Sequence, residues 1–164
     1  MLQSHHMALK ITREKYPYRQ AVLGIIIDEN KQFLIVQKLN YQKNEWSFAG
    51  GGIEKDETPK QAVVRELEEE LGSKKFKVVA ESKIPYSYEW PDQVILKQYR
   101  KVGKFYRGAL IKYFLVKFFG KKEELKLQAD ELRAIKWVKL EELPKHLIFP
   151  SQWYSAKKVL KELL

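Results

Sequence analysis

The chain has no cysteine, and among its 164 residues only 3 are histidine and 2 are methionine. Without cysteine there can be neither a disulfide framework nor a thiolate metal site. We therefore expect a protein of the reducing cytoplasm, where disulfides are rare. The histidines are two neighbours near the start, His5 and His6, and a lone His146, so we expect no histidine metal site.

Long apolar runs are also missing. The longest, such as AVLGIII and YFLVKFF, are far shorter than the ~20 residues that a membrane-spanning helix needs. We expect no membrane association, and no obligate protein partner is evident. The segment MLQSHHM lacks the apolar core of a secretory signal, and we expect residues 1–10 to be a tag remnant or a disordered N-terminus. Residues 11–164 are long and apolar enough to form a single domain.

Negative charge is scarce, because 31 basic residues face 21 acidic ones and give a formal net charge of +10. The imbalance is greatest from Lys97 to Lys122, a stretch with nine basic residues and no acidic one. Such a stretch favours a polyanionic partner, such as RNA, a nucleotide or another phosphate-rich ligand. The alternative is a lysine-rich surface that is merely solvated.

Many of the acidic residues gather in one segment, GGGIEKDETPKQAVVRELEEELG. Its second half carries the signals of a helix. Thr58 can cap the N-terminus, Pro59 stands at the favoured first position, and Gln61 completes a capping box. Because Gly72 supplies a left-handed C-terminal stop, the segment predicts a helix over Pro59–Leu71.

Strands dominate the rest of the chain. Two β-rich runs in RQAVLGIIIDENKQFLIVQKLN are separated by the polar turn DENK, which predicts a hairpin. KFKVVAES, GALIKYFLVKFF and AIKWVKL predict further strands, and KNEWSFAGGG a short extended piece. EELPKH is typical of a brief helical turn, and the apolar spacing in PSQWYSAKKVLKELL predicts a C-terminal helix capped by Ser151. With two long helices, the pattern predicts an α+β fold, a mixed β-sheet packed between helices in an αβα sandwich.

Three carboxylates of the first predicted helix share one side. At about 100° per residue, Glu66, Glu69 and Glu70 fall within roughly 100° of arc, whereas Glu68 points elsewhere. Like charges on neighbouring turns are unfavourable by roughly 0.2–0.5 kcal/mol per pair. A divalent cation would turn this repulsion into coordination. The alternative is an acidic helix face exposed to solvent.

The spacing around these glutamates matches a known motif. From Gly51, five residues lead to Glu57, and seven more lead to RELEEELG, which begins at Arg65. This arrangement matches the Nudix box, G-x5-E-x7-R-E-U-x-E-E-x-G-U with U aliphatic, except that Ser73 stands in the last position. The chain therefore resembles the Nudix hydrolases. The resemblance implies the Nudix fold and a metal-dependent hydrolase that cleaves a nucleoside diphosphate linked to another moiety.

The resemblance also implies the metal site. Glu66, Glu69 and Glu70 would hold Mg²⁺ or Mn²⁺, and the carbonyl of Gly50 would add a ligand. One carboxylate of the box would act as general base, with Glu69 and Glu70 as the first candidates.

The other positions of the box have supporting roles by the same resemblance. Gly51 and Gly52 would let the backbone approach the metal and the pyrophosphate of the substrate closely. Glu57 and Arg65 would pair with each other and tie the glycine loop to the helix.

Similarity outside the box is weaker and resembles the branch of RNA pyrophosphohydrolases and diadenosine tetraphosphate hydrolases. It lies in WSF, KYFLV, ELRAIKWV and the C-terminal helix. In that branch a glutamate before the strand of Trp137 supplies a metal ligand, and Glu131 occupies the similar place. The alternative for Glu131 is a surface acid. The chain departs from the branch at Ala49 and Gly50, where proline and glutamine are usual, and at GAL before KYF.

The same branch places basic residues against phosphates at positions that match Arg19, Lys38 and Lys112. Each could instead be a solvated surface charge.

Aromatic residues near the basic stretch could stack on a base, and we single out Tyr88, Trp90 and Tyr106. Packing in the core or at its rim is the alternative for each of them.

These features together lead us to expect a pyrophosphohydrolase that cleaves a nucleotidic polyphosphate by attack of metal-activated water on phosphorus. A dinucleoside polyphosphate or the 5′-triphosphate end of RNA is the preferred substrate. The alternatives are a nucleotide-sugar or nucleoside triphosphate pyrophosphohydrolase, and a non-catalytic Nudix module that binds nucleotide or RNA. Such modules usually lose carboxylates of the box, and this chain retains them all.

Overall fold

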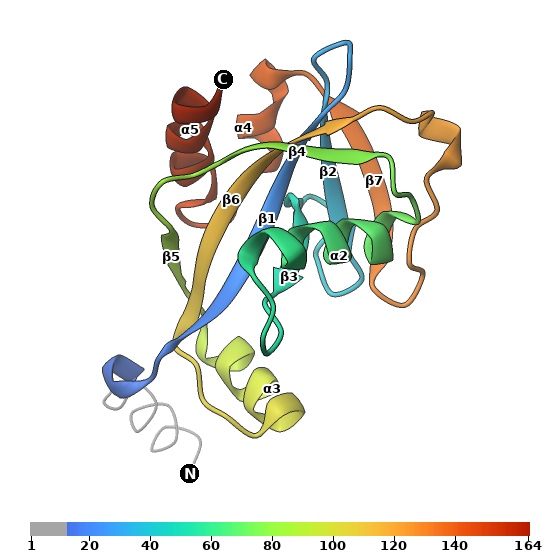
Figure 1. The fold of residues 1–164 in the computed structure, drawn as a ribbon. Helices are drawn as coiled ribbons and strands as arrows, with labels where there is room; N and C mark the ends of the chain where they lie inside the picture. The colour runs from blue at the N-terminus through green and yellow to red at the C-terminus, as the bar shows by residue number, and fades with distance from the viewer. Residues whose placement is uncertain (1–12) are drawn as a thin grey trace.

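The long strand β1 (Tyr18–Ile27) runs through the middle of the sheet (Figure 1). The structure is a computed structural model that describes residues 13–164. Its seven-stranded mixed sheet has the order β4-β6-β1-β2-β7, with β3 also paired to β1 and β5 to β6. The other strands are β2 (Phe33–Lys38), β3 (Ala49–Gly52), β4 (Phe76–Glu81), β5 (Tyr86–Glu89), β6 (Gly108–Phe118) and β7 (Leu132–Val138).

Helices make up the rest of the regular structure. The α-helices of the described part are α2 (Pro59–Leu71), α3 (Asp92–Val102), α4 (Leu143–His146) and α5 (Gln152–Leu163). Short 3₁₀ turns are η1 (Arg13–Lys15), η2 (Lys122–Glu124) and η3 (Leu140–Glu142). None of these helices is long and apolar enough to cross a membrane. The prediction for residues 1–10 lies outside the described residues.

One edge of β1 pairs with two different strands. Near the end of β1, Ile26 and Ile27 pair antiparallel with β2, which confirms the predicted hairpin. Nearer its start, Ala21–Gly24 pairs antiparallel with β3. The other edge of β1 pairs in parallel with β6 along the whole strand. This arrangement places the glycines of β3 against the middle of the sheet.

The helix α2 begins and ends where the sequence predicts. The side chains and backbones of Thr58 and Gln61 form the reciprocal bonds of a capping box, at 2.9 and 3.1 Å. Gly72 adopts a left-handed conformation with φ 64° and donates its N–H to the carbonyl of Glu68. These local bonds fix the length of the helix that carries the box carboxylates.

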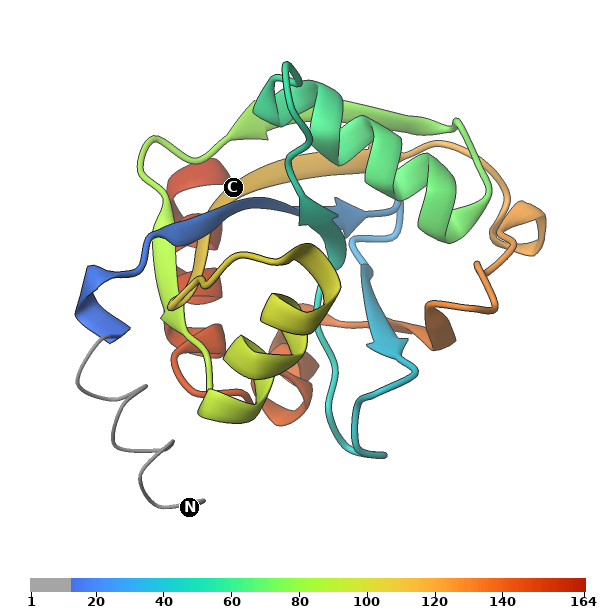
Figure 2. The same ribbon diagram turned by 90° about the horizontal axis from the view of Figure 1, so that it is seen from below.

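Two elements, β5 and α3, lie where no strand or helix is predicted. The expectation of two long helices is therefore wrong, because α3 adds a third that ends at Gly103 in a left-handed conformation. This helix lies at the end of the sheet where β1 and β6 begin (Figure 2). Part of the basic stretch from Lys97 is thus helical.

The start of α5 also differs from the prediction. Ser151 occupies the N-cap position, but its φ is 67° and its side chain makes no capping hydrogen bond. The side-chain amide of Gln152 makes the hydrogen bonds at this end of the helix instead. Its oxygen accepts the N–H of Phe149 at 3.1 Å, and its nitrogen donates to the carbonyl of Trp46 at 2.8 Å.

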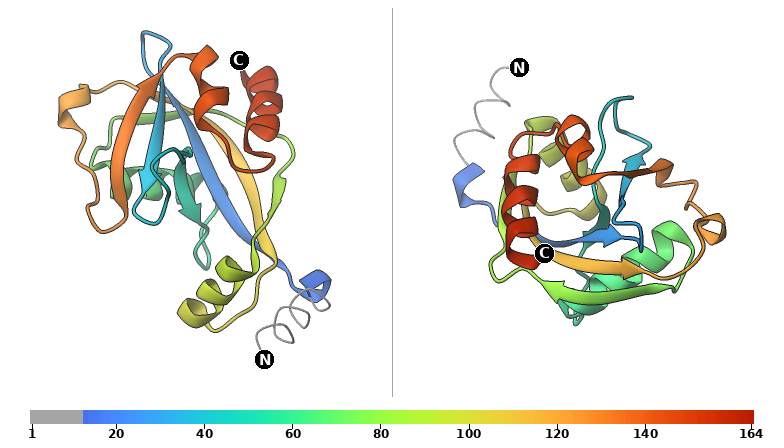
Figure 3. Two further views of the ribbon diagram at one scale, coloured as in Figure 1. Left: turned by 180° about the vertical axis from the view of Figure 1, so that it is seen from behind. Right: turned by 90° about the horizontal axis from the view of Figure 1, so that it is seen from above.

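The two faces of the sheet carry separate apolar cores. Seen from behind, α4 and α5 lie in front of the sheet and α2 lies behind it (Figure 3, left). Val63, Leu67 and Leu71 of α2 are buried in one core. Ala156, Val159 and Leu160 are buried in the other. The predicted α+β fold with its αβα layers is therefore confirmed.

Candidate active site

The glycines of β3 pass directly under α2. Gly50 has φ 151°, and a Cβ there would overlap the carbonyl oxygen of Val22. A Cβ on Gly51 would lie 2.6 Å from Oε1 of Glu66. Gly50 therefore requires glycine, whereas a side chain at Gly51 would have to displace the carboxylate of Glu66.

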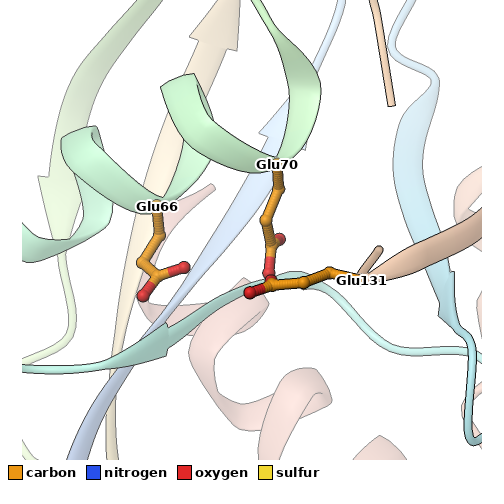
Figure 4. Close-up of side chains that lie close together, drawn as sticks. All are labelled: Glu66, Glu70 and Glu131. Carbon is orange, nitrogen blue, oxygen red and sulfur yellow. The ribbon is translucent and has the colours of Figure 1, made fainter. Parts of the chain in front are cut away.

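Three carboxylates converge beside these glycines. Glu66 and Glu70 extend from α2 toward Glu131, which lies in the turn before β7 (Figure 4). One ligand atom from each lies within 4.8 Å of the others. The backbone of Glu131 is held in place because its carbonyl accepts the N–H of Leu39 at 3.0 Å. Residues far apart in the sequence thus form one acidic cluster.

Glu70 is the most deeply placed member of this cluster, with 1% of its surface exposed. Burial raises its pKa to about 8, while nearby Lys38 and the N–H of Gly50, at 3.3 Å from Oε2, favour the ionised form. Burial also raises the pKa of Glu66, and the guanidinium of Arg65 opposes that shift. A cation between these groups would remove the cost of ionising them.

Arg65 connects the glycine loop with the helix. Its Nε and Nη2 donate to the carboxylate of Glu57 at 2.7 and 2.9 Å, so the pair expected from the sequence is present. Nη2 also donates to the carbonyl of Gly52, and Nη1 to Glu66, each at 3.0 Å. The hydrogen bonds from Arg65 lower the pKa of Glu57 to about 2. This network orients Glu66 toward the cluster.

Glu69 lies outside the cluster. Its side chain is 52% exposed, and it accepts a hydrogen bond from Nη1 of Arg65 at 3.3 Å. Glu68 is also outside the cluster, as the helical spacing indicates. The role of Glu69 as a metal ligand or general base stays a prediction, and so does that of the Gly50 carbonyl as a ligand.

Lys38 lies next to the acidic cluster. It is the last residue of β2 and pairs with Leu132, just after Glu131, across an irregularity in the β2–β7 register. Its charge favours the ionised form of Glu70. A phosphate bound at the cluster would therefore have a cation beside it.

The other two predicted phosphate contacts are farther apart. Arg19 covers Gly52, because a Cβ there would collide with its guanidinium. Lys112 instead pairs with Glu81 at 3.3 Å on the β4 side of the sheet. Arg19 thus borders the glycines, whereas Lys112 is not brought together with it.

The predicted stacking residues are half-buried. The hydroxyl of Tyr88 hydrogen-bonds to that of the fully buried Tyr113 at 2.5 Å. The ring of Tyr106 lies under the ammonium group of Lys104 at 5.2 Å. The backbone of Trp90 is tied on both sides, since its carbonyl accepts from Arg13 and its N–H donates to Arg107. For Tyr88, these contacts agree with the alternative of packing at the rim of the core.

The donor set of the cluster fits a hard divalent cation. Oxygen ligands from carboxylates are what Mg²⁺ and Mn²⁺ prefer, usually together with waters and substrate phosphates. Three carboxylates with one buried member, next to a backbone that only glycine allows, provide such a site.

The model of the NUDIX domain matches residues 17–161 of this chain. The chain belongs to the Nudix family. It is similar to the RNA pyrophosphohydrolase of Rickettsia conorii, with 35% identity over 149 residues that cover 89% of each chain. It is a Nudix hydrolase by this relationship.

Solved structures share the fold of this Nudix chain. The dihydroneopterin triphosphate pyrophosphohydrolase of E. coli has a TM-score of 0.68 at 16% identity, covering 87% of this chain and 96% of its own. The Ap4A hydrolase of C. elegans, in a binary complex, has a TM-score of 0.62 at 19% identity, covering 87% and 97%. At these identities the likeness shows the fold alone.

Two features of the Nudix site have no counterpart among the sequence predictions. Arg65 contacts Glu66 and Glu69 in addition to Glu57, and its spacing of four residues from Glu69 is a signal that indicates the second contact. Lys38 lies near Glu70 because of the pairing of β2 with β7. No local pattern around Lys38 indicates this proximity.

Proposed function

We propose that this Nudix pyrophosphohydrolase depends on Mg²⁺ or Mn²⁺ and cleaves a phosphoanhydride bond at the 5′-triphosphate end of RNA. The convergence of Glu66, Glu70 and Glu131 beside the glycines of β3 carries the proposal. Similarity to proteins named RNA pyrophosphohydrolase supports the RNA end as substrate. A dinucleoside polyphosphate is the second candidate, since it presents the same anhydride chemistry.

The acidic cluster supplies the metal ligands in this proposal. A bound cation would polarise the phosphate oxygens and lower the pKa of the attacking water. Glu66, Glu70 and Glu131 would hold it, with the carbonyl of Gly50 as a further ligand. Glu70 must be ionised to bind the cation, and the positive charge of Lys38 favours this form.

The remaining residues would position the substrate and move a proton. The oxygen of water forms a bond to one phosphorus, and the anhydride bond to the leaving phosphate breaks. A carboxylate accepts the proton of the water. Glu69 is the first candidate, because it is exposed beside the cluster residues and oriented by Arg65. Lys38 and Arg19 would contact phosphates on either side of the glycines.

A substrate panel with defined products tests the proposal. The panel contains triphosphorylated RNA, diadenosine tetraphosphate, a nucleotide sugar and free nucleoside triphosphates, each with and without Mg²⁺. We expect metal-dependent turnover with the highest kcat/KM on the RNA end. Faster turnover of another member would assign that substrate instead, and no turnover of any member would leave a nucleotide-binding module.

Substitutions in the cluster test the assignment of its residues. We expect Glu66→Gln and Glu70→Gln each to lower kcat by on the order of 100-fold or more, since each removes a charged ligand. Glu68→Gln is the matched control, because it lies on the same helix outside the cluster. Equal activity of Glu70→Gln and the control would exclude the cluster as the metal site.

A further inference from the structure

The helix α3 stands apart from the two helical layers. It lies at the end of the sheet where β1 and β6 begin, and Ile95 is its one buried residue (Figures 1 and 2). Asp92 at its start pairs with Arg13 at 3.1 Å. This helix therefore contributes little to the core, and its exposed surface needs another explanation.

Aromatic stacking fixes the other end of α3. The ring of Tyr99 stacks on that of Phe105, with centroids 4.0 Å apart and an angle of 9° between the planes. Phe105 stacks in turn on Tyr16, at 4.9 Å and 11°. These contacts hold one side of the helix against the chain and leave the opposite side exposed.

The exposed side of α3 carries a row of cations, which we name the α3 basic face. It consists of Lys97, Arg100 and Lys101, which lie on one side of α3 at the spacing i, i+3 and i+4, and of Lys104, which follows just after the helix ends at Gly103. All four are exposed. Among residues 13–164, none of the four has a carboxylate within ion-pair distance.

The helix geometry explains this arrangement only in part. Cations near a helix C-terminus are favoured by the helix dipole, by about 0.3–1 kcal/mol each. Like charges three and four residues apart on a helix are unfavourable by about 0.2–0.5 kcal/mol per pair, and α3 carries two such pairs, Lys97 with Arg100 and Lys97 with Lys101. A bound polyanion would turn these repulsions into attraction and release its own counterions.

The α3 basic face lies at the end of the sheet where β1 begins (Figure 2). From there β1 runs to the glycines of β3, which lie beside the acidic cluster. Glu66 lies over Gly51, and Arg19 covers the neighbouring Gly52. Arg19 pairs with Ala109, at the start of β6, in the parallel β1–β6 ladder. The segment between α3 and β6 adds Arg107, which lies over the ring of Tyr18 at 5.0 Å and pairs with Glu89 at 2.7 Å. Cations thus line the start of β1 and β6 between the glycines and α3, with the charge of Arg107 offset by Glu89.

We propose that the α3 basic face binds the phosphodiester backbone of single-stranded RNA downstream of the 5′ end held at the acidic cluster. This inference rests on the proposed function and names a second contact for the same substrate. RNA is favoured over an anionic membrane because a membrane-binding helix presents an apolar face to the lipid. α3 offers a lipid surface just two exposed large apolar side chains, Tyr99 and Val102, because Ile95 is buried and Tyr99 itself is stacked on Phe105.

The double variant Lys97→Ala/Lys101→Ala tests this surface. Its matched control is Lys157→Ala/Lys161→Ala, an exposed pair with the same spacing on α5. The first measurement is fluorescence anisotropy of a labelled single-stranded RNA longer than about 16 nucleotides in the presence of EDTA, from about 50 to 200 mM salt. We expect the α3 variant to reduce the slope of log K against log salt by about 1.4, or roughly 0.7 for each lost phosphate contact. We expect the control to leave the slope unchanged.

The second measurement compares KM for substrates of different length. We expect the α3 variant to raise KM for the long triphosphorylated RNA by about tenfold, with unchanged KM for diadenosine tetraphosphate and unchanged kcat for both. An unchanged salt slope, an equal loss in the α5 control, or salt-resistant binding to anionic vesicles in place of RNA would overturn the inference. If no substrate is turned over but RNA binding still depends on Lys97 and Lys101, the proposed function fails and the α3 surface stands.

Discussion

At Gly51 the backbone of β3 passes beneath the carboxylate of Glu66, so close that a Cβ would lie 2.6 Å from Oε1. Gly51 needs no left-handed backbone, and its neighbour would be the end of a flexible side chain. We therefore expect Gly51→Ala to displace Glu66 and weaken Mg²⁺ binding by on the order of tenfold, as loss of a positioning contact does. The free energy of unfolding should change by less than about 1 kcal/mol. Calorimetric titration with Mg²⁺ and urea unfolding measure the two effects.

Gly50 provides the contrast at the next residue. Its φ of 151° and the carbonyl of Val22 leave no room for a side chain. Gly50→Ala should therefore destabilise the fold by about 2 kcal/mol or more, since the backbone itself must move. If both alanine variants lose stability equally, the separate roles given to the two glycines are wrong.

The residues of the acidic cluster differ in how far the sequence could predict them. Helical spacing puts Glu66 and Glu70 on one side of α2, and this much follows from local periodicity. Glu131 follows from the resemblance to the Nudix branch. The proximity of Lys38 depends on which residues of β2 and β7 face each other and on an irregularity at the end of β2. Such register is set by long-range packing, which no short segment encodes.

Among the elements, α2 owes its start to a side-chain cap and α5 does not. Oγ1 of Thr58 accepts the N–H of Gln61 at 3.1 Å, whereas Ser151 makes no such bond. We expect Thr58→Ala to lower the free energy of unfolding by about 1 kcal/mol. Ser151→Ala, at the same position of the other helix, should have little effect. Urea unfolding of both variants measures the difference, and an equal loss in the two would contradict the capping assignment.

The same comparison explains why α2 could be predicted and α3 could not. In α2 the capping box, the proline and the final glycine all lie within the helix segment and its flanks. In α3 the N-cap is Pro91, which makes no side-chain cap, and Ile95 is its one buried residue. Ile95, Tyr99 and Val102 do recur at the i, i+4 and i+7 spacing of a helix, so what is missing is a side-chain cap that would mark where the helix begins. Gly103 and the spacing of the α3 basic face are the signals that indicate it.

For the whole molecule, the charge is divided between a basic exterior and an acidic cluster. The net charge of +10 attracts a polyanion. The cluster instead brings three carboxyl groups together, and one of them, Glu70, is almost completely shielded from water. Because burial raises the pKa of Glu70 to about 8, the folded metal-free protein retains a proton that the unfolded chain loses near pH 4.5. Stability from this residue is therefore fully present below pH 4.5 and is lost as the pH rises toward 8.

Replacing the carboxyl group of Glu70 by an amide should remove this loss of stability at high pH. In Glu70→Gln the amide oxygen can still accept the N–H of Gly50, but nothing must ionise in the buried site. We expect the metal-free variant to melt at the same temperature as the wild type at pH 4.5 and at a higher temperature at pH 8. The gain in free energy should approach about 1.4 kcal/mol for each pH unit crossed. Mg²⁺ at pH 8 should raise the melting temperature of the wild type but not of Glu70→Gln, because only the wild type offers the charged ligand. Scanning calorimetry at the two pH values, with Glu68→Gln as control, measures this difference. A variant less stable than the wild type at pH 8 without metal would show that Glu70 is ionised and satisfied by Lys38 alone.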